Sequence, residues 1–273
     1  MSTLLSKVVG KLKKRPPRLL TVKQAKRITP NMIRVTFHGP ELKGFPTGRE
    51  GANCKLMIPA EGQNQVSFTE QLNGGSKPTT RTYTVRAFRE VELELDIDFV
   101  VHSHAGNSGP ACNWAEEARE SSFCGFAGPS EPKMTEFYAD WYLLAADMSA
   151  LPIISTTMEA MPNDAKGVAI IEVLSESDVQ NLIHPDGIEI RWIVSPNPME
   201  LSTKQMNLIR NMEWPDGVVQ TCVAGESGVI RSIRDFLHNE KKLPKADCYI
   251  SGYWKIGLIE DQHQAEKRAE SNS

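Results

Sequence analysis

The hydrophobic pattern of this chain changes its period near Gly128-Pro129, and this change limits the possible folds more than any other feature. From Leu19 to Ala127 apolar residues tend to alternate with polar ones, as in short β-strands with one buried face. Short strands broken by Gly and Pro predict an antiparallel β-barrel or sandwich. A tight turn at Arg89-Glu90 joins two of these strands, and the second has one acidic and one buried face. The expected strands are 32–38, 53–59, 81–88, 91–101 and 123–127.

Beyond the break the expected strands are continuously apolar, and helical segments separate them. Such a pattern predicts a parallel α/β sheet of the Rossmann-like kind, with its ligand at the carboxyl ends of the strands. The expected strands are 141–146, 167–174, 188–194, 218–224 and 247–251, and the expected helices are 147–161, 203–211, 228–239 and a polar terminal helix, 258–269. We divide the chain into a basic leader (1–18), a barrel domain (19–132), a hinge (133–140) and an α/β domain (141–273).

Composition excludes several classes of protein. A net charge of −3 gives no sign of a nucleic-acid partner, and no apolar stretch is long enough to span a bilayer. Five scattered cysteines without a C-x-x-C pair predict neither disulfides nor a metal site, and favour a reducing compartment. The basic N-terminus lacks the uncharged core of a signal peptide. It is either a solvated leader or an arm that touches membrane. We expect a cytoplasmic protein.

The stretch Arg81-Thr82-Tyr83-Thr84-Val85-Arg86 is the first candidate site. On a strand Arg81, Tyr83 and Val85 share one face, and Thr82, Thr84 and Arg86 share the other. The first face combines a guanidinium fork with an aromatic ring, which suits a ligand that has a phosphate and a flat ring. The alternative is an ordinary exposed strand, because β-propensity alone explains Thr, Tyr and Val.

A helix start after His102 is the second candidate. Pro110 suits the first helical position, and Gly109 before it allows close approach of a ligand. The first N–H groups of a helix attract phosphate; the alternative is a plain strand-to-helix loop. No G-x-G-x-x-G follows any strand. A nicotinamide would instead have to lie against the small side chains of Ala145-Ala146-Asp147-Met148-Ser149. The alternative is that these residues are small only because they pack inside the fold.

Together these motifs resemble the siderophore-interacting proteins, which are flavin-dependent ferric-siderophore reductases. The resemblance covers about residues 17 to 270. Cys112, where many relatives have Ser, and Ile256, where a second basic residue is frequent, depart from the family pattern. The similar segments are Arg81 to Arg86, His102 with Gly109-Pro110-Ala111 and Trp114, Leu144 to Pro152, Ala224-Gly225-Glu226, and Ser251 to Lys255 with the acidic and basic residues that follow.

The resemblance implies an FAD-binding antiparallel barrel followed by an NAD(P)-binding domain of the ferredoxin-reductase type. Arg81 would hold the diphosphate, Tyr83 would pack against the flavin, and Thr84 would reach its N5 region. Tyr83 and Thr84 lie on opposite strand faces, so both touch the flavin only if the ring lies edge-on to the strand end. The implied cofactor-binding residues are Arg81, Thr82, Tyr83, Thr84, Val85, Arg86, His102, Gly109, Pro110, Ala111, Cys112, Trp114, Ala146, Asp147, Ser149, Glu226, Tyr253 and Trp254.

The implied activity is electron transfer from NADH, NADPH or a ferredoxin through FAD to siderophore-bound Fe(III), with no catalytic side chain. An anionic ferric siderophore would meet Lys55, Lys133 and Lys255, whose alternative role is as solvated surface lysines. The acidic run 175–178 would repel the 2′-phosphate of NADPH and therefore favours NADH. Lys204 and Arg210 could still reach the position of that phosphate, which would favour NADPH. The alternative functions are a flavin reductase with a protein or quinone acceptor, and a siderophore-binding protein without turnover.

Overall fold

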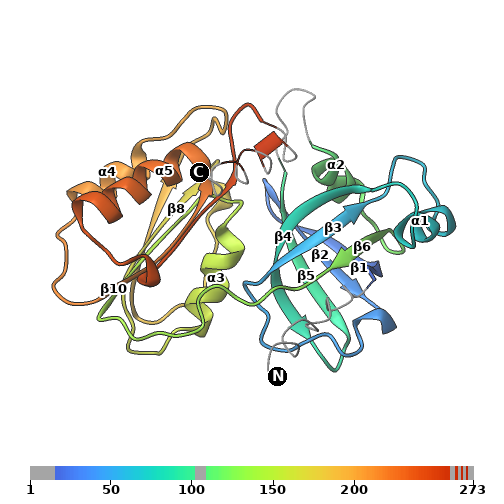
Figure 1. Ribbon diagram of the computed structural model, residues 1–273, viewed down its shortest axis with the longest axis horizontal. Helices are drawn as coiled ribbons and strands as arrows, with labels where there is room; N and C mark the ends of the chain where they lie inside the picture. The colour runs from blue at the N-terminus through green and yellow to red at the C-terminus, as the bar shows by residue number, and fades with distance from the viewer. Residues whose placement is uncertain (1–15, 102–108, 259–261, 264–265, 267–268, 270–273) are drawn as a thin grey trace, which may run out of the picture.

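Two β-sheets of different kinds lie side by side, with one helix between them (Figure 1). The computed structural model describes residues 16–101, 109–258, 262, 263, 266 and 269. His102, residues 1–15 of the expected leader, and most of the expected terminal helix therefore lie outside the described residues. Within the described part, no helix has the length and apolar character needed to cross a bilayer.

The N-terminal half is a closed antiparallel barrel in the order β1-β2-β5-β4-β3-β6, which confirms the predicted barrel. Its interior is filled by buried side chains such as Phe37, Leu56, Phe99 and Phe126. The strands are β1 (Arg18–Thr29), β2 (Met32–His38), β3 (Asn53–Ile58), β4 (Thr79–Arg89), β5 (Glu94–Val100) and β6 (Phe123–Ala127), and the helices are η1 (Pro40–Leu42), α1 (Gln65–Leu72) and α2 (Pro110–Glu117).

Three details of the barrel differ from the predictions. β5 begins at Glu94 rather than Val91, because residues 90–93 form a turn in which Leu93 has a φ of 50°. Helix α1 was not predicted; Asn64 caps it and only Phe68 is buried, so it carries little apolar signal. The acidic face of β5 is not solvated, because Asp96 and its neighbours are covered by basic partners. These pairs are Lys23–Glu94, Arg89–Asp96 and Arg34–Asp98.

The C-terminal half is a five-stranded parallel sheet in the order β11-β10-β7-β8-β9, as predicted. Helix α3 covers the face turned toward the barrel, and α4 and α5 lie on the other face (Figure 1). The strands are β7 (Trp141–Ala146), β8 (Lys166–Val173), β9 (Gly187–Val194), β10 (Val219–Glu226) and β11 (Cys248–Trp254), and the helices are α3 (Leu151–Ala160), η2 (Glu176–Asp178), α4 (Lys204–Asn211), α5 (Ser227–Asp235), the π-helical η3 (Phe236–Glu240) and η4 (Lys245–Asp247).

The element ends beside the predicted site also differ. Helix α3 begins at Leu151, because residues 148–150 form a turn after Asp147. Strand β11 extends to Trp254, so Tyr253 and Trp254 belong to the sheet rather than to a following loop. Both changes place the predicted residues at one edge of the sheet, where strands end.

Candidate functional site

Cross-strand pairing assigns each face of β4. Tyr83 pairs with Cys54 and Arg81 with Leu56, both of which are buried in the barrel. Residues directly opposite in an antiparallel pair share a face. Arg81, Tyr83 and the fully buried Val85 therefore belong to the inner face, as the alternation predicts.

The outer face of β4 carries hydroxyl groups. Thr82 lies opposite Lys55, whose ammonium group donates a hydrogen bond to the Thr82 hydroxyl. Thr84 lies opposite Asn53 and is only 5% exposed, because β11 of the other half covers it. Tyr83 and Thr84 thus occupy opposite faces, so a flavin that touches both must lie across an end of the strand.

Arg86, at the end of the motif, pairs with an acidic residue of the α/β half. Its guanidinium donates to both carboxylate oxygens of Glu159 on α3, at 3.1 and 2.6 Å, and also lies 3.9 Å from Asp98. A register shift between Val85 and Ala87 interrupts the alternation at this point. The structure therefore places Arg86 in the contact between the two halves.

Aromatic side chains close one end of the barrel. The Tyr83 ring lies 4.4 Å from Phe99, centre to centre, and Phe99 lies 5.7 Å from Trp114 on α2. Trp114 also stacks on Phe37 at 6.0 Å with an interplanar angle of 11°. These contacts hold α2 against the barrel and bring Trp114 to the same end as Tyr83.

The start of α2 has the features of an anion-binding end. Gly109 is the N-cap and offers no side chain to the first turn, and Pro110 follows it. Ala111 and Cys112 turn their side chains into the barrel core, being 4% and 9% exposed. Their backbone N–H groups belong to the first turn, where a helix presents donors along its axis. This donor set is of a kind that suits the diphosphate of FAD, for which the Arg81 guanidinium on β4 is a second candidate ligand.

Two tyrosines of β11 face the barrel across the boundary between the halves. The hydroxyls of Tyr249 and Tyr253 are 3.1 Å apart, and the Tyr253 phenol lies beside the Thr84 hydroxyl. Burial, together with the neighbouring Tyr249, raises the pKa of Tyr253 well above its usual value, so both phenols stay neutral. Tyr249 lies beside Asn53 of β3 in turn. Sequence reasoning missed Tyr249 and Asn53, although Tyr249 shares a strand face with Tyr253 at a spacing of four residues.

The strand order of the parallel sheet reverses between β7 and β10: the chain adds β8 and β9 on one side of β7, and β10 and β11 on the other. The predicted Asp147 lies at this switch point, just after β7. In open α/β sheets ligands bind at such a switch point. Asp147 Oδ1 accepts from Ser149 N at 2.8 Å and Ser149 Oγ at 2.5 Å, and Oδ2 accepts from Glu226 N at 2.8 Å and Trp254 Nε1 at 2.7 Å. Burial raises the pKa of Asp147, and these four donors oppose that rise.

Asp147 thus connects the ends of three strands. It follows Ala146, the fully buried last residue of β7, and binds the ends of β10 and β11. Gly225 has a φ of +148°, and a Cβ there would lie 2.7 Å from Asp147 Oδ2, so only glycine fits. The predicted Ala146, Asp147, Ser149 and Trp254 are therefore brought together.

Glu226 acts as a cap rather than as an open carboxylate. Its Oε2 accepts from Gly228 N and Val229 N at the start of α5, at 2.6 and 2.9 Å. Its Oε1 accepts from Ile256 N at 3.2 Å, which ties the chain after β11 to the same point. Glu226 fixes the edge of the sheet and is 7% exposed.

Of the two acidic residues in the run 175–178, Glu176 is exposed and Asp178 is turned toward the barrel half. Asp178 is fully buried and accepts hydrogen bonds from Asn31 in the barrel half. Glu172, near the end of β8, instead faces the edge beside Asp147; it accepts from Ser202 Oγ at 2.8 Å, and burial raises its pKa. Lys204 donates to the carbonyl of Val194 at 2.6 Å.

The three lysines predicted to meet the substrate come from different elements. Lys55 lies on the outer face of the barrel beside Thr82, and Lys133 is exposed in the connection before β7. Lys255 follows β11 and donates to Glu266 at 2.6 Å. The described contacts join Lys55 and Lys255 to different neighbours, and none of those contacts brings the three lysines together.

A barrel joined to a parallel sheet of this kind defines the ferredoxin-reductase class of folds. The likeness extends to the ferredoxin-NADP+ reductase from Plasmodium falciparum, with a TM-score of 0.55 at 13% identity over 87% of this chain and 96% of that chain. At that identity the likeness shows the fold alone.

Sequence comparison gives the family. The model described as "Siderophore-interacting FAD-binding domain" matches residues 21–133, and the model described as "Siderophore-interacting protein" matches residues 139–257. The ferric vibriobactin reductase ViuB of Vibrio cholerae is 36% identical over 262 residues, covering 92% of this chain and 94% of that protein. The chain belongs to the siderophore-interacting protein family.

Two further relatives agree with this assignment. The NADPH-dependent ferric-chelate reductase of Escherichia coli is 29% identical, covering 87% of this chain and 92% of that protein. The crystal structure of the siderophore-interacting protein SipS from Aeromonas hydrophila superposes with a TM-score of 0.81 at 31% identity, over 94% of this chain and 99% of that chain. The predicted family and FAD as its cofactor are confirmed.

Proposed function

We propose that this protein is an FAD-dependent ferric-siderophore reductase that releases iron by reducing siderophore-bound Fe(III) to Fe(II). The observation that carries the proposal is the meeting of β4 with β11, where Thr84 of the FAD-binding barrel touches Tyr253 of the parallel sheet. A flavin at this end of β4 lies between the barrel that binds it and the edge where a nucleotide binds.

Different described residues bind different parts of FAD. Arg81 and the first-turn N–H groups of α2, at Ala111 and Cys112, hold the diphosphate, because a guanidinium fork and a helix start both match phosphate oxygens. Tyr83 and Trp114 form the apolar wall at the same end of the barrel. Thr84 offers its hydroxyl from the opposite strand face. The flavin supplies the step from a two-electron donor to a one-electron acceptor.

The sheet edge favours NADH as the electron donor. Glu172 lies near the end of β8, so the extra phosphate of an NADPH whose adenosine lies over that strand would meet a carboxylate. The nicotinamide, at the other end of the dinucleotide, then packs toward β11, on the hydrogen-bonded floor that Asp147, Ser149 and Trp254 form. A ferredoxin is a further donor that the proposal allows, since it delivers electrons to the flavin without using this edge.

The substrate is an anionic ferric siderophore, and Lys55, Lys133 and Lys255 supply positive charge toward it. The protein works in the cytoplasm. The five cysteines support this, because all lie within the described residues and form no disulfide there, and Cys54, Cys112, Cys124 and Cys222 are buried.

One anaerobic experiment tests the function. The purified holoprotein should show the absorption spectrum of oxidised flavin and bleach on adding NADH. Adding a ferric siderophore should then restore the oxidised spectrum and produce Fe(II), captured by a ferrous chelator. A flavoprotein that bleaches with NADH but is not reoxidised by any ferric siderophore would exclude this function and favour a protein or quinone acceptor.

A further inference from the structure

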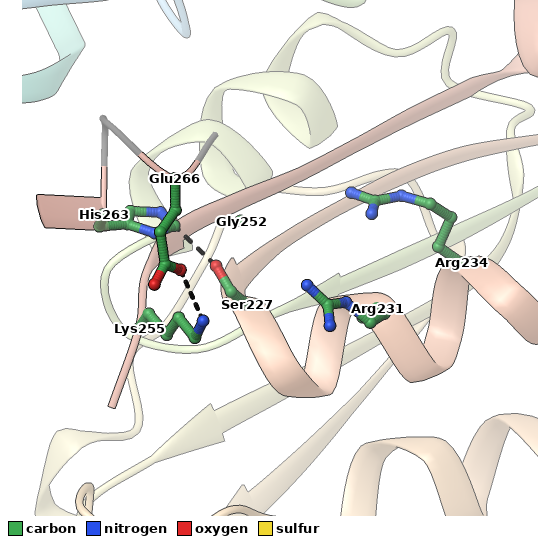
Figure 2. Close-up of a pocket in the computed structure, with 7 residues that line it drawn as sticks. All are labelled: Ser227, Arg231, Arg234, Gly252, Lys255, His263 and Glu266. Carbon is green, nitrogen blue, oxygen red and sulfur yellow. Dashed lines mark hydrogen bonds and ion pairs between the residues drawn. The ribbon is translucent and has the colours of Figure 1, made fainter. Parts of the chain in front are cut away.

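A small pocket opens where α5 begins and β11 ends, with His263 and Glu266 on its remaining side (Figure 2). Its volume is about 50 Å³, which suits a single compact group rather than a whole cofactor. It lies outside the flavin and nicotinamide positions described above. Its lining residues are Ser227, Arg231, Arg234, Gly252, Lys255, His263 and Glu266.

The pocket gathers positive charge from two elements. Ser227, Arg231 and Arg234 are spaced by four and three residues on α5, so they share one side of the helix. Lys255 enters from the chain after β11, facing the same space (Figure 2). Glu266 is the single carboxylate among the described residues that line the pocket. Among the described residues of the lining, three cations therefore face one anion.

The start of α5 does not supply this pocket with backbone donors. Gly228 N and Val229 N are both bonded to Glu226, so the helix end is already capped. Recognition in the pocket comes from side chains, namely two guanidinium groups, an ammonium group and the Ser227 hydroxyl. Guanidinium forks match the oxygen geometry of phosphate and carboxylate groups.

Glu266 places an oxyanion in this pocket. Its Oε2 accepts a hydrogen bond from Lys255 Nζ at 2.6 Å, although Glu266 is eleven residues away along the chain. The pair is moderately exposed, with side-chain exposures of 36% and 45%. Such pairs contribute little to stability and are displaced at low cost. His263 is 3% exposed and lies 3.5 Å from Ser227 Oγ, which fixes the wall behind the pair.

We infer that this pocket is a binding subsite for one compact oxyanion of a larger ligand, and that Glu266 is its built-in competitor. The subsite takes a phosphate monoester or a carboxylate. The inference rests on the proposed function only for the source of that group, which we take to be a carboxylate of a ferric chelate, because NADH carries no phosphate monoester. The 2′-phosphate of NADPH is the alternative source that the experiment distinguishes.

Titration of inorganic phosphate into the ¹⁵N-labelled full chain, in chloride buffer, tests the subsite without reduction or iron. We expect saturable amide shifts over residues 227–234. Glu266→Gln should tighten phosphate binding about threefold to tenfold, because the competing charge is lost. The double variant Arg231→Gln/Arg234→Gln should weaken it at least about tenfold. Arg191→Gln, a matched control on β9 that pairs with Glu189, should leave binding unchanged.

Three results would overturn the subsite: no localised shifts in the native chain and in Glu266→Gln, no tightening in Glu266→Gln, or equal weakening by Arg191→Gln. Thermal unfolding shows whether each variant is folded. If the double variant is not folded, the single variant Arg234→Gln takes its place. Adenosine 2′-monophosphate and iron-free citrate then identify the source, since the correct one should bind more tightly than phosphate. If neither compound binds more tightly than phosphate, the pocket is not a subsite for a substrate. Because no turnover is involved, failure here is distinguishable from failure of the reductase function.

Discussion

The carboxylate of Asp178 in the α/β half accepts two hydrogen bonds from Asn31, which lies in the turn between β1 and β2 of the barrel. Oδ1 accepts from the backbone N at 2.9 Å and Oδ2 from Nδ2 at 2.8 Å, across 147 residues of sequence. Asp178 is fully buried, and Ser175 Oγ donates to it at 2.7 Å. A satisfied buried carboxylate of this kind fixes the position of one half relative to the other.

Removing this carboxylate should destabilise the whole protein. Asp178→Ala leaves the Asn31 N–H groups buried without their acceptor, and we expect a loss of about 2–4 kcal/mol in the free energy of unfolding. Asn31→Ala should cost less, because the backbone donor remains. Asp186→Ala, at an exposed position before β9, is the matched control. Urea denaturation followed by circular dichroism measures all three. A native-like midpoint for Asp178→Ala would contradict the argument.

The same carboxylate should make stability depend on pH. Burial alone would raise the pKa of Asp178, but hydrogen bonds from Asn31 and Ser175 outweigh it and hold the pKa below its usual value. Its stabilising contribution is therefore complete above the unfolded value of about 3.9, and it disappears as pH falls through the folded pKa. The difference in unfolding free energy between the native chain and Asp178→Asn should be largest near pH 7 and shrink below about pH 4. A constant difference over that range would contradict it.

The sequence predicts the sheets better than it predicts the contacts between them. Alternation and continuous apolar runs indicate a barrel and a parallel sheet, because each pattern reflects burial of strand faces by neighbours in the same half. The role of Asp178 could not be predicted in this way. An acid just after a strand looks like a charge at the nucleotide edge, and only the docking of the halves shows that it faces Asn31.

Arg86 shows the same limit. The family resemblance implied that it binds the cofactor, and its pairing with Glu159 on α3 could not be predicted from the motif. Asp147 and Trp254 were predicted from the family resemblance, and the structure brings them together at 2.7 Å. A local motif predicts which residues matter, whereas the partner of each charge depends on packing between distant segments.

Arg81 and Arg86 should therefore respond differently to the same substitution. Arg81→Gln removes the proposed diphosphate ligand, so FAD occupancy of the purified protein should fall and its dissociation constant should rise at least about tenfold. Arg86→Gln breaks the pair with Glu159, so it should retain FAD and lose about 1–2 kcal/mol of stability. Flavin absorbance per protein and thermal unfolding separate the two effects. Loss of FAD in Arg86→Gln with stability intact would reverse the assignment.

Asp147 should not tolerate its closest isostere. All four of its hydrogen bonds are accepted from N–H or O–H donors. In Asp147→Asn an amide NH₂ must face two of these donors, so we expect a loss of about 2–3 kcal/mol in stability. Asp140→Asn is the control, because Asp140 Oδ2 accepts one hydrogen bond, from Val218 N, in an exposed setting. This substitution should lower the stability less than Asp147→Asn does. Equal costs for the two substitutions, measured by urea denaturation, would refute the argument.

Glu172 should set the preference between the two nicotinamide donors. It lies near the end of β8, bonded to Ser202 and close to Asp147, so a 2′-phosphate at this edge meets negative charge. In Glu172→Gln that repulsion is lost, while the hydrogen bond from Ser202 to the side-chain oxygen is retained. We expect the NADH-to-NADPH ratio of kcat/KM to fall about tenfold, mainly through a lower KM for NADPH. Glu189→Gln on β9, whose carboxylate pairs with Arg191, is the control. A ratio that does not move in Glu172→Gln would place the adenosine of the donor elsewhere on the sheet.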